Sequence, residues 1–139
     1  MKKNESVTHI MTKNPVTAHH GDPISKVRQL FEDNNIQHLP VVSGDELIGM
    51  ISWGDMLRIS FGDAFGQSEE SVDVTLDHTF EIEDIMTEEI RSIESDHSIR
   101  DAAVALSESH FHALPVVSGK ELVGIVTSQD LIKYLVSLY

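Results

Sequence analysis

Apolar and polar residues follow the same pattern twice along this chain. In the first occurrence, four apolar positions at helical spacing come after Asp22-Pro23 and form a single stripe: Ile24, Val27, Leu30 and Phe31. This spacing predicts a helix with Asp22 as its N-cap and Pro23 as its first residue. Asn34-Asn35 is the predicted end of the helix. The stripe returns later in the chain at four positions: Ile99, Ala102, Ala103 and Leu106.

A β-hairpin is predicted after each of these two helices. Two apolar runs flank a short polar turn in each copy: residues 39–42 and 47–52 in the first, residues 114–117 and 122–127 in the second. Each turn contains a glycine, Gly44 or Gly119, which is typical of hairpins. A short extended segment precedes each helix, and a second helix begins near Trp53 and near Ser128. Each copy therefore predicts a β-α-β-β-α unit of an α+β fold, with both amphipathic helices covering one face of a small sheet.

The two copies form an internal repeat with a constant offset. Ile10-Met11-Thr12 returns as Ile85-Met86-Thr87, and every other matched pair also lies 75 positions apart. No insertion interrupts this stretch, so both copies should have one shape. The predicted organisation is a first repeat at residues 1–61, a connector at 62–80 and a second repeat at 81–139. Each repeat is so small that we expect the two to pack on each other. The connector is expected to be an ordinary surface linker with a helical turn around Ala64-Phe65.

Each repeat ends in the same polar motif, which is Ser52 with Asp55 in the first and Thr127 with Asp130 in the second. A hydroxyl residue between a strand and a helix lies beside unpaired backbone N–H groups and the positive end of the helix dipole, which favours a phosphate. The aspartate one turn later suits the vicinal hydroxyls of a ribose. The motif therefore indicates a nucleotide site. Ser-x-x-Asp at a helix start is also a capping box with a purely structural role, and this alternative stays open.

Taken in order, these motifs resemble a tandem pair of cystathionine β-synthase (CBS) domains, a Bateman module. The resemblance rests on Ile10-Met11-Thr12 with Thr17, Leu39-Pro40-Val41-Val42 and Gly49-x-x-Ser52-x-x-Asp55 in the first repeat, and on Ile85-Met86-Thr87 with Ser92, Leu114-Pro115-Val116-Val117 and Gly124-x-x-Thr127-x-x-Asp130 in the second. It implies two β-α-β-β-α units packed sheet to sheet about a pseudo-twofold axis, with two clefts between them. The family binds adenosine-containing ligands in these clefts: AMP, ADP, ATP, S-adenosylmethionine or, less often, a dinucleotide.

The resemblance also implies roles for individual residues. Asp55 and Asp130 would hold ribose hydroxyls, while Ser52 and Thr127, with the amides that follow them such as that of Ser128, would hold phosphate. The residues implied to line the adenine are Thr17, Ala18, Ser92, Ile93, His38 to Pro40 and Ala113 to Pro115. Many phosphate-binding members place a cation near the cleft, and the candidates in this sequence are Arg58, Arg91, Arg100 and Lys133.

Charge and composition limit the classes of ligand and partner that we expect. The 139 residues carry a formal charge of −13, which argues against a nucleic-acid partner. The scarcity of cations favours AMP or S-adenosylmethionine over ATP. Because Trp53 is bulkier than the equivalent Ser128, the second motif is expected to be the better site. The chain has no cysteine, no apolar run long enough to span a bilayer and no signal peptide behind Lys2-Lys3, so we expect a cytoplasmic protein.

Metal binding and catalysis have little support in the sequence. Of the eight histidines, His110 and His112 alone form a plausible pair, and no third ligand has matching spacing. The chain lacks a Gly-x-Ser-x-Gly turn, a Walker loop and cysteine, so we do not expect an enzyme. The last helix, from Asp130 to Tyr139, is apolar on more than one side, so either the core or another subunit should cover it. The resemblance to CBS pairs, which commonly associate as dimers through such helices, implies a homodimer.

The sequence therefore predicts a non-catalytic sensor that binds an adenosine-containing ligand and acts on a partner protein in trans. The alternative is a ligand-free structural or oligomerisation module whose polar motifs serve only as helix caps. A sensor should lose binding with little loss of stability when Asp130 is changed to alanine, whereas a pure cap should lose stability only.

Overall fold

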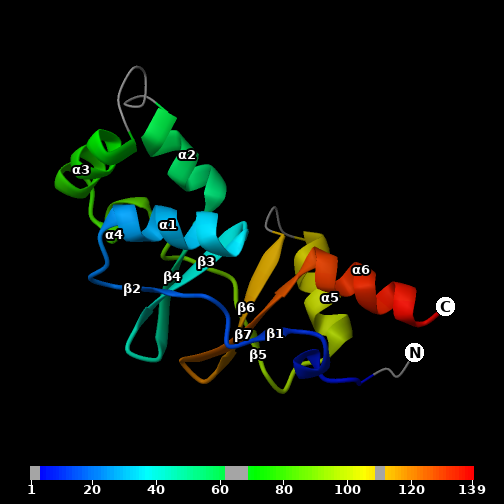
Figure 1. Cartoon of the computed structure of the whole chain (residues 1–139). Coiled ribbons are helices and arrows are strands. Elements are labelled where there is room, and N and C mark those ends of the chain that lie inside the picture. Colours follow the sequence, from blue (N-terminus) through cyan, green and yellow to red (C-terminus); the bar gives the residue numbers. More distant parts are fainter. Residues whose placement is uncertain (1–3, 62–68, 109–111) are drawn as a thin grey trace. The chain divides into compact units, whose positions relative to one another are not determined.

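The computed structural model describes residues 4–61, 69–108 and 112–139. The elements in chain order are η1 (Val7–His9), β1 (Thr12–Lys13), β2 (Ala18–His19), α1 (Ile24–Asn34), β3 (His38–Ser43), β4 (Glu46–Ser52), α2 (Trp53–Phe61), α3 (Glu69–Thr79), α4 (Ile82–Ile85), β5 (Ile93–Glu94), α5 (Ile99–Glu108), β6 (Ala113–Ser118), β7 (Glu121–Thr127) and α6 (Ser128–Ser137). The predicted β-α-β-β-α order is confirmed in both repeats, as β2-α1-β3-β4-α2 and as β5-α5-β6-β7-α6 (Figure 1). Within the described ranges, no helix combines the length and the apolar character needed to cross a membrane.

The chain forms two compact units, and each of them combines segments of both repeats. Unit 1 consists of residues 1–15, 45–47 and 91–139, and unit 2 consists of residues 16–44 and 48–90. The first Ile-Met-Thr motif therefore belongs to the unit that contains most of the second repeat, and the second motif belongs to the other unit. The repeat boundaries in the sequence do not reveal this exchange of segments.

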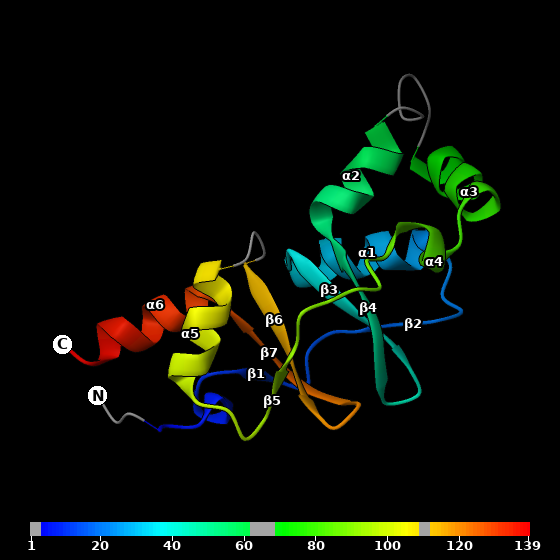
Figure 2. The same ribbon diagram turned by 180° about the vertical axis from the view of Figure 1, so that it is seen from behind.

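Unit 2 contains the strands in the order β2-β3-β4, with β2 parallel to β3 and Ala18 opposite Val41. Helix α3 contacts α1 in this unit (Figure 2). The buried core residues are Ala18, Ile24, Val27, Phe31, Leu39, Val41, Ile51, Met56, Val72, Leu76 and Ile82. Three members of the predicted apolar stripe on α1 belong to this core, and the fourth, Leu30, packs against it. The predicted inner face of α1 is therefore confirmed.

Unit 1 contains the strands in the order β5-β6-β7, and β1 adds to the outer side of β7 as an antiparallel strand. The buried core residues are Val7, Ile93, Ala102, Ala105, Leu106, Leu114, Val116 and Val126. The side chain of Val7 is fully buried, and its N–H donates to the carbonyl of His97 at 2.9 Å. The N-terminal segment is thus an integral part of this core.

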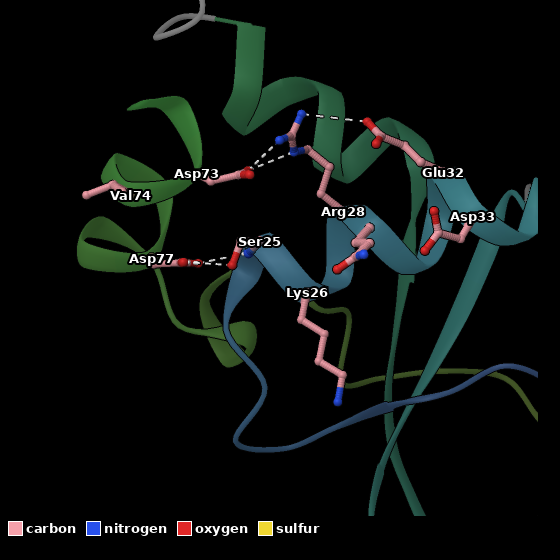
Figure 3. Close-up of a pocket in the computed structure, with 9 residues that line it drawn as sticks. Ser25, Lys26, Arg28, Glu32, Asp33, Asp73, Val74 and Asp77 are labelled. Atoms are coloured by element: carbon pink, nitrogen blue, oxygen red, sulfur yellow. Dashed lines mark hydrogen bonds and ion pairs between the residues drawn. The ribbon is translucent and has the colours of Figure 1, made fainter. Parts of the chain in front are cut away.

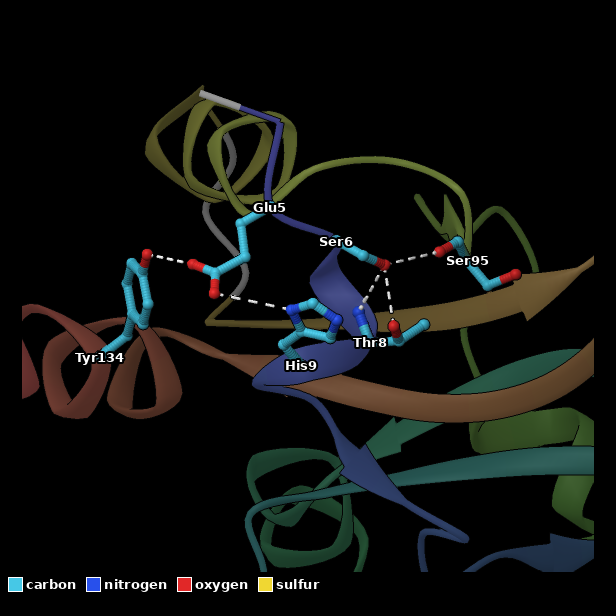
Figure 4. A network of polar contacts seen from close by, with 6 residues as sticks. All are labelled: Glu5, Ser6, Thr8, His9, Ser95 and Tyr134. Carbon is cyan, nitrogen blue, oxygen red and sulfur yellow. Dashed lines mark hydrogen bonds and ion pairs between the residues drawn. The ribbon is translucent and has the colours of Figure 1, made fainter. Parts of the chain in front are cut away.

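Polar contacts hold the same N-terminal segment against the second repeat (Figure 4). The Ser6 hydroxyl donates to the carbonyl oxygen of Ser95 at 3.3 Å. The Tyr134 hydroxyl, on α6, donates to one carboxylate oxygen of Glu5, and the other carboxylate oxygen lies 3.6 Å from Nδ1 of His9. The hydrogen bond to Glu5, together with burial, raises the pKa of Tyr134 above its ordinary value of 10.0. The segment therefore contacts both the start of α5 and the body of α6.

Two glycines allow the exchanged segments to lie close to the strands that receive them. A Cβ atom at Gly124 would lie 2.4 Å from Sδ of Met11 and 2.9 Å from the backbone oxygen of Thr12. At the equivalent Gly49, a Cβ atom would lie 2.5 Å from Sδ of Met86. Both glycines are part of the repeated motif, and close backbone approach gives a physical reason for glycine at these positions.

The start of α1 differs from the prediction. Pro23 is the N-cap residue, and its side chain makes no capping hydrogen bond. The carboxylate of Asp22 accepts a hydrogen bond from the His19 N–H at 2.8 Å and so is used outside the helix. The cap is supplied by α3, because Asp77 accepts hydrogen bonds from the Ser25 N–H at 2.8 Å and from the Ser25 hydroxyl at 2.7 Å. Sequence reasoning missed this cap because its donor and acceptor lie 52 positions apart.

The second half of the predicted connector is a packed helix and not a surface linker. Val72 and Leu76 of α3 are buried in the core of unit 2. The Arg28 guanidinium binds Asp73, with Nη2 2.6 Å from a carboxylate oxygen (Figure 3). The predicted turn around Ala64-Phe65 lies outside the described residues. Helix α3 is therefore fixed to α1 by apolar packing as well as by polar contacts.

Candidate functional site

The polar motif of the second repeat lies where β7 leads into α6. The Thr127 hydroxyl accepts a hydrogen bond from the Asp130 N–H at 3.2 Å, and the Thr127 N–H donates to Oδ2 of Asp130 at 2.9 Å. The Ser128 N–H donates to the carbonyl of His112 at 2.9 Å. This amide is therefore already bonded within the protein, and the residue itself is half-exposed.

The first repeat has the same geometry where β4 leads into α2. The Ser52 N–H donates to Oδ2 of Asp55 at 2.8 Å, and the Asp55 N–H donates to the Ser52 hydroxyl at 3.1 Å. The Trp53 N–H donates to the carbonyl of Gln37 at 2.9 Å, which corresponds to the bond between Ser128 and His112. The Arg58 guanidinium adds an ion pair with Oδ1 of Asp55. The two helix starts thus share these backbone hydrogen bonds and differ in their side-chain contacts: Arg58 binds Asp55 in the first, whereas the Thr127 hydroxyl donates to Oδ2 of Asp130 at 3.1 Å in the second.

Both motifs form the capping box that the sequence left open as an alternative. The box uses one carboxylate oxygen of each aspartate, and a carboxylate has a second oxygen with further acceptor capacity. Capping and ligand binding are therefore compatible at both positions. It also follows that Asp130→Ala lowers stability whichever function is right, so stability alone cannot separate the two hypotheses.

In unit 1, the residues proposed to line an adenine lie next to the polar motif. Ala113 is the direct cross-strand partner of Thr127, and Pro115 is the partner of Ile125. Ile93 pairs with Val116 on the neighbouring strand. Ala113, Pro115 and Ile93 are buried, whereas Ser92 is exposed. The structure therefore places Ala113 and Pro115 beside the last residues of β7, where α6 begins, whereas Ile93 lies farther along β6, towards its other end.

In unit 2, the equivalent residues occupy equivalent places. Ala18 and Pro40 are buried, whereas Thr17 and His38 are half-buried. The bond from Trp53 to Gln37 places the start of α2 beside the start of β3. Because most of the apolar members in both units are buried, a ligand here would contact mainly backbone groups and the half-exposed polar side chains.

Within the part of the chain that the structure describes, Arg58 is the one candidate cation of the four that is bound to a residue of the predicted site. Arg91 forms an ion pair with Glu108, with Nη2 3.6 Å from the carboxylate oxygen. Lys133 and Arg100 have exposed side chains on α6 and α5. Sequence reasoning named Arg58 without placing it; the signal that could have placed it is its position three residues after Asp55, where helical side chains meet.

The predicted histidine pair consists of His110 and His112. His110 lies outside the described residues, and His112 is exposed beside the start of β6. Among the residues that the structure describes, no group of three or more His, Asp or Glu side chains is arranged to hold a metal ion.

A groove of 680 Å³ between α1 and α3 was not predicted from the sequence (Figure 3). Several of its polar groups bond with one another: Arg28 binds Asp73 and Glu32, and Ser25 binds Asp77. None of the predicted site residues lines it. We interpret the groove as the contact zone of the two helices.

Comparisons with known proteins agree with the repeat and with the fold. The family model described as CBS domain matches residues 7–62 and residues 82–137. An uncharacterized protein of Methanocaldococcus jannaschii is 34% identical over 145 residues, which cover 98% of this chain and 33% of that protein. An L-aspartate semialdehyde sulfurtransferase of the same organism is 30% identical over 90% of this chain and 22% of that enzyme. The chain thus spans a third or less of the length of these two relatives.

Two solved structures are similar over nearly the whole chain. The CBS domain pair of protein MJ0100, in complex with 5′-methylthioadenosine and S-adenosyl-L-methionine, is 26% identical with a TM-score of 0.77, covering 96% of this chain and 98% of that chain. CBSX2 of Arabidopsis thaliana, in complex with AMP, is 21% identical with a TM-score of 0.79, and the covered shares are again 96% and 98%. The second likeness shows the fold alone.

Proposed function

Because this chain belongs to the CBS domain family, with one domain in each repeat, we propose that it is a regulatory sensor of an adenosine-containing ligand. The ligand binds at the start of α6 in unit 1 and at the start of α2 in unit 2. Asp130 and Asp55 hold the ribose hydroxyls, and Thr127 with Ser128, or Ser52, holds the phosphate. The protein is not an enzyme in this proposal, and it acts on a partner protein.

The observation that carries the proposal is the duplicated placement of the site residues. In each unit a half-buried hydroxyl and a half-buried carboxylate stand at a helix start, directly beside the strand that carries the candidate adenine residues. A capping box explains the hydroxyl and one carboxylate oxygen. It leaves the second carboxylate oxygen and the neighbouring polar side chains available, and their occurrence at both helix starts supports a ligand role.

The ligand classes in the proposal are AMP, ADP, ATP and S-adenosylmethionine. The formal charge of −13 opposes the binding of highly charged anions. AMP and S-adenosylmethionine are therefore favoured over ATP. The structural relatives support an adenosine ligand, since one binds AMP and another binds 5′-methylthioadenosine and S-adenosyl-L-methionine.

Ligand binding at either site can be passed on through the chain. Thr127 and its neighbours end β7, and β7 pairs with Thr12 and Lys13 of β1. The chain then leaves unit 1 after Pro15 and reaches Thr17 of the other candidate site two residues later. In the proposal, a ligand that orders one helix start changes how firmly the exchanged segment is held, and a partner protein reads that change.

The proposal is tested by thermal unfolding with AMP, ADP, ATP and S-adenosylmethionine, using wild type, Asp130→Ala and Asp101→Ala. Asp101 forms an equivalent capping box with Ser98 at the start of α5, with both hydrogen bonds at 3.0 Å. The Ser95 N–H donates to Val117, so α5 begins at the opposite end of β6 from Ala113. Asp101→Ala is therefore a matched control that removes a cap outside the site.

A ligand at a hundred times its dissociation constant stabilises the folded state by about 2.7 kcal/mol, or very roughly 5–10 °C for a chain of this size. We expect Asp101→Ala to keep the ligand-induced shift and Asp130→Ala to lose most of it, although both variants unfold at a lower temperature without ligand. Equal ligand-induced shifts in both variants would contradict the assignment of Asp130 to the ligand.

One observation favours the alternative of a ligand-free association module. Helix α6 has no buried residue, and its exposed apolar side chains include Ile132 at 59%, Leu135 at 49% and Val136 at 68%. These spacings form one helical stripe, which suits a homodimer. Light scattering tests this: a dimer that becomes a monomer in Val136→Glu and tightens with salt, together with no response to any adenosine ligand, would favour this alternative over the sensor.

A further inference from the structure

The two candidate sites differ in what occupies the second oxygen of the aspartate. Oδ2 of Asp55 and Oδ2 of Asp130 both accept the N–H of the residue that begins the box. Oδ1 of Asp55 is bound by the Arg58 guanidinium. For Oδ1 of Asp130, the part of the chain that the structure describes supplies no ion-pair partner, although Lys133 occupies the position equivalent to Arg58. The aspartate of the first site is therefore paired with a cation, whereas that of the second site is half-buried and has no ion-pair partner among the described residues.

This difference changes which chemical groups a ligand needs in order to bind at each site. In the proposed function the ribose hydroxyls bind the aspartate, so at the first site they compete with Arg58 for Asp55. The Arg58 side chain is 74% exposed and can turn away from Asp55 without breaking any core packing. The displaced guanidinium then needs a new anion close to the start of α2. A 5′-phosphate supplies that anion, and arginine binds phosphate with charge-assisted hydrogen bonds.

A ligand without a phosphate has no such compensation. Its ribose would break the exposed ion pair of Arg58 with Asp55, and water alone would then solvate the guanidinium, so such a ligand gains less from Asp55 than a ligand with a phosphate. At the second site the same ligand meets the free oxygen of Asp130 and displaces nothing. The formal charge of −13 strengthens the contrast, because a phosphate needs a local cation to offset the field of the whole chain.

We propose that Arg58 is a specificity-determining residue that makes the first site select adenosine ligands with a 5′-phosphate, while the second site accepts adenosine ligands without one. This assignment rests on the proposed function of the two helix starts. The chain then has two sites of different specificity. The first binds a nucleoside monophosphate, and the second also binds uncharged adenosine derivatives.

Trp53 allows the first site to be observed separately. It is the single tryptophan of the chain, it follows Ser52 directly, and its ring packs against Phe31 with a centroid distance of 5.5 Å. Its fluorescence therefore reports on the start of α2, where the ligand binds in this proposal. Calorimetry on the same samples reports binding at both sites.

The test compares AMP with 5′-methylthioadenosine, which share adenosine and differ in the 5′ group, in wild type, Arg58→Ala and Lys133→Ala. We expect the Trp53 signal of wild type to show tighter binding of AMP. In Arg58→Ala this preference should fall by roughly 10-fold or more, as expected for the loss of a charged hydrogen bond. Lys133→Ala, the matched control from the second repeat, should change neither dissociation constant seen by Trp53 by more than about 2-fold. Added salt screens the repulsion by the chain in both proteins and the attraction by Arg58 only in wild type, so AMP binding should gain less from salt in wild type than in Arg58→Ala.

The outcomes separate the two proposals. If both ligands bind and Arg58→Ala leaves the preference unchanged, or weakens both ligands equally, the assignment of Arg58 is overturned while the adenosine sensor stands. If calorimetry detects no binding of either ligand to wild type, the proposed function fails, and the role of Arg58 fails with it. Circular dichroism of Arg58→Ala, an exposed position, verifies that the variant is folded in each case.

Discussion

The exchange of segments between the repeats makes Gly124 a position where a single methyl group should disrupt unit 1. A Cβ atom there would lie 2.9 Å from the backbone oxygen of Thr12 and 2.4 Å from Sδ of Met11. The methionine side chain is flexible and can move aside. The Thr12 oxygen cannot move without shifting β1, whose pairing with β7 among the described residues consists of Thr12 and Lys13.

The cost of Gly124→Ala can be bounded from these contacts. Moving β1 weakens up to two ladder hydrogen bonds, each with a net contribution of about 0.5–1.5 kcal/mol. Overpacking a close contact costs a similar amount, about 1–3 kcal/mol. We therefore expect a loss of about 1–3 kcal/mol in the free energy of unfolding, or very roughly 3–10 °C in the melting temperature.

Urea titration followed by circular dichroism measures this loss, and two other glycines calibrate it. Gly21→Ala is the control, because a Cβ atom there meets nothing within 4 Å. It should be neutral or stabilise by about 0.4–1 kcal/mol through the unfolded chain. The stability of Gly49→Ala should lie between those of the other two variants, since a Cβ atom there would be 3.2 Å from the nearest backbone oxygen, that of Thr87. Equal free energies of unfolding for Gly124→Ala and Gly21→Ala would contradict the close contact between β1 and β7.

Three further results are expected. Asp77→Ala removes the cap of α1 and should cost about 0.5–2 kcal/mol in urea titration, with faster hydrogen exchange in α3; unchanged exchange there would refute the anchoring role of Asp77. Hydrogen bonds from Ser98 lower the pKa of Asp101, so its contribution is present above its ordinary value of 3.8 and lost as pH falls through the lower folded value. The stability gap between wild type and Asp101→Ala should therefore shrink in acid, and a constant gap would contradict this. Because the pKa of Tyr134 is raised, its contribution is full below pH 10.0 and declines above it; melting of Tyr134→Phe should lack that alkaline decline, and a decline as steep as in wild type would be inconsistent with the bond to Glu5.

The elements of the fold could be predicted because their determinants are local. The stripe from Ile24 to Phe31, the turns at Gly44 and Gly119 and the helix starts at Trp53 and Ser128 all depend on neighbouring residues. Helix α1 ends at Asn34, with Asn35 in the left-handed conformation as C-cap, which is where the sequence placed the end. The β-α-β-β-α order follows from these local signals.

The features that were missed depend on residues far apart in the chain. The cap of α1 comes from Asp77 and not from Asp22, since the tertiary position of α3 decides which carboxylate reaches Ser25. The segment that forms α3 was predicted to be a linker because it is rich in acidic residues. Its two buried apolar residues, Val72 and Leu76, do not stand out in such a composition.

The candidate site was predictable as a set of positions but not as a set of contacts. The repeat identified both aspartates and both hydroxyl residues, and the structure places them beside the expected strands. The ion pair of Arg58 with Asp55 could not be read from the repeat, because the equivalent residue is Lys133 and makes no such contact within the described residues. The roles of the adenine residues remain predictions.

The central claim is that the two helix starts bind an adenosine-containing ligand, and calorimetric titration of the chain with AMP tests it most directly. The account predicts saturable heat for wild type and for Asp101→Ala, and loss of that heat in the double variant Asp55→Ala/Asp130→Ala. Absence of heat in wild type, or the same heat in the folded double variant, would contradict the claim.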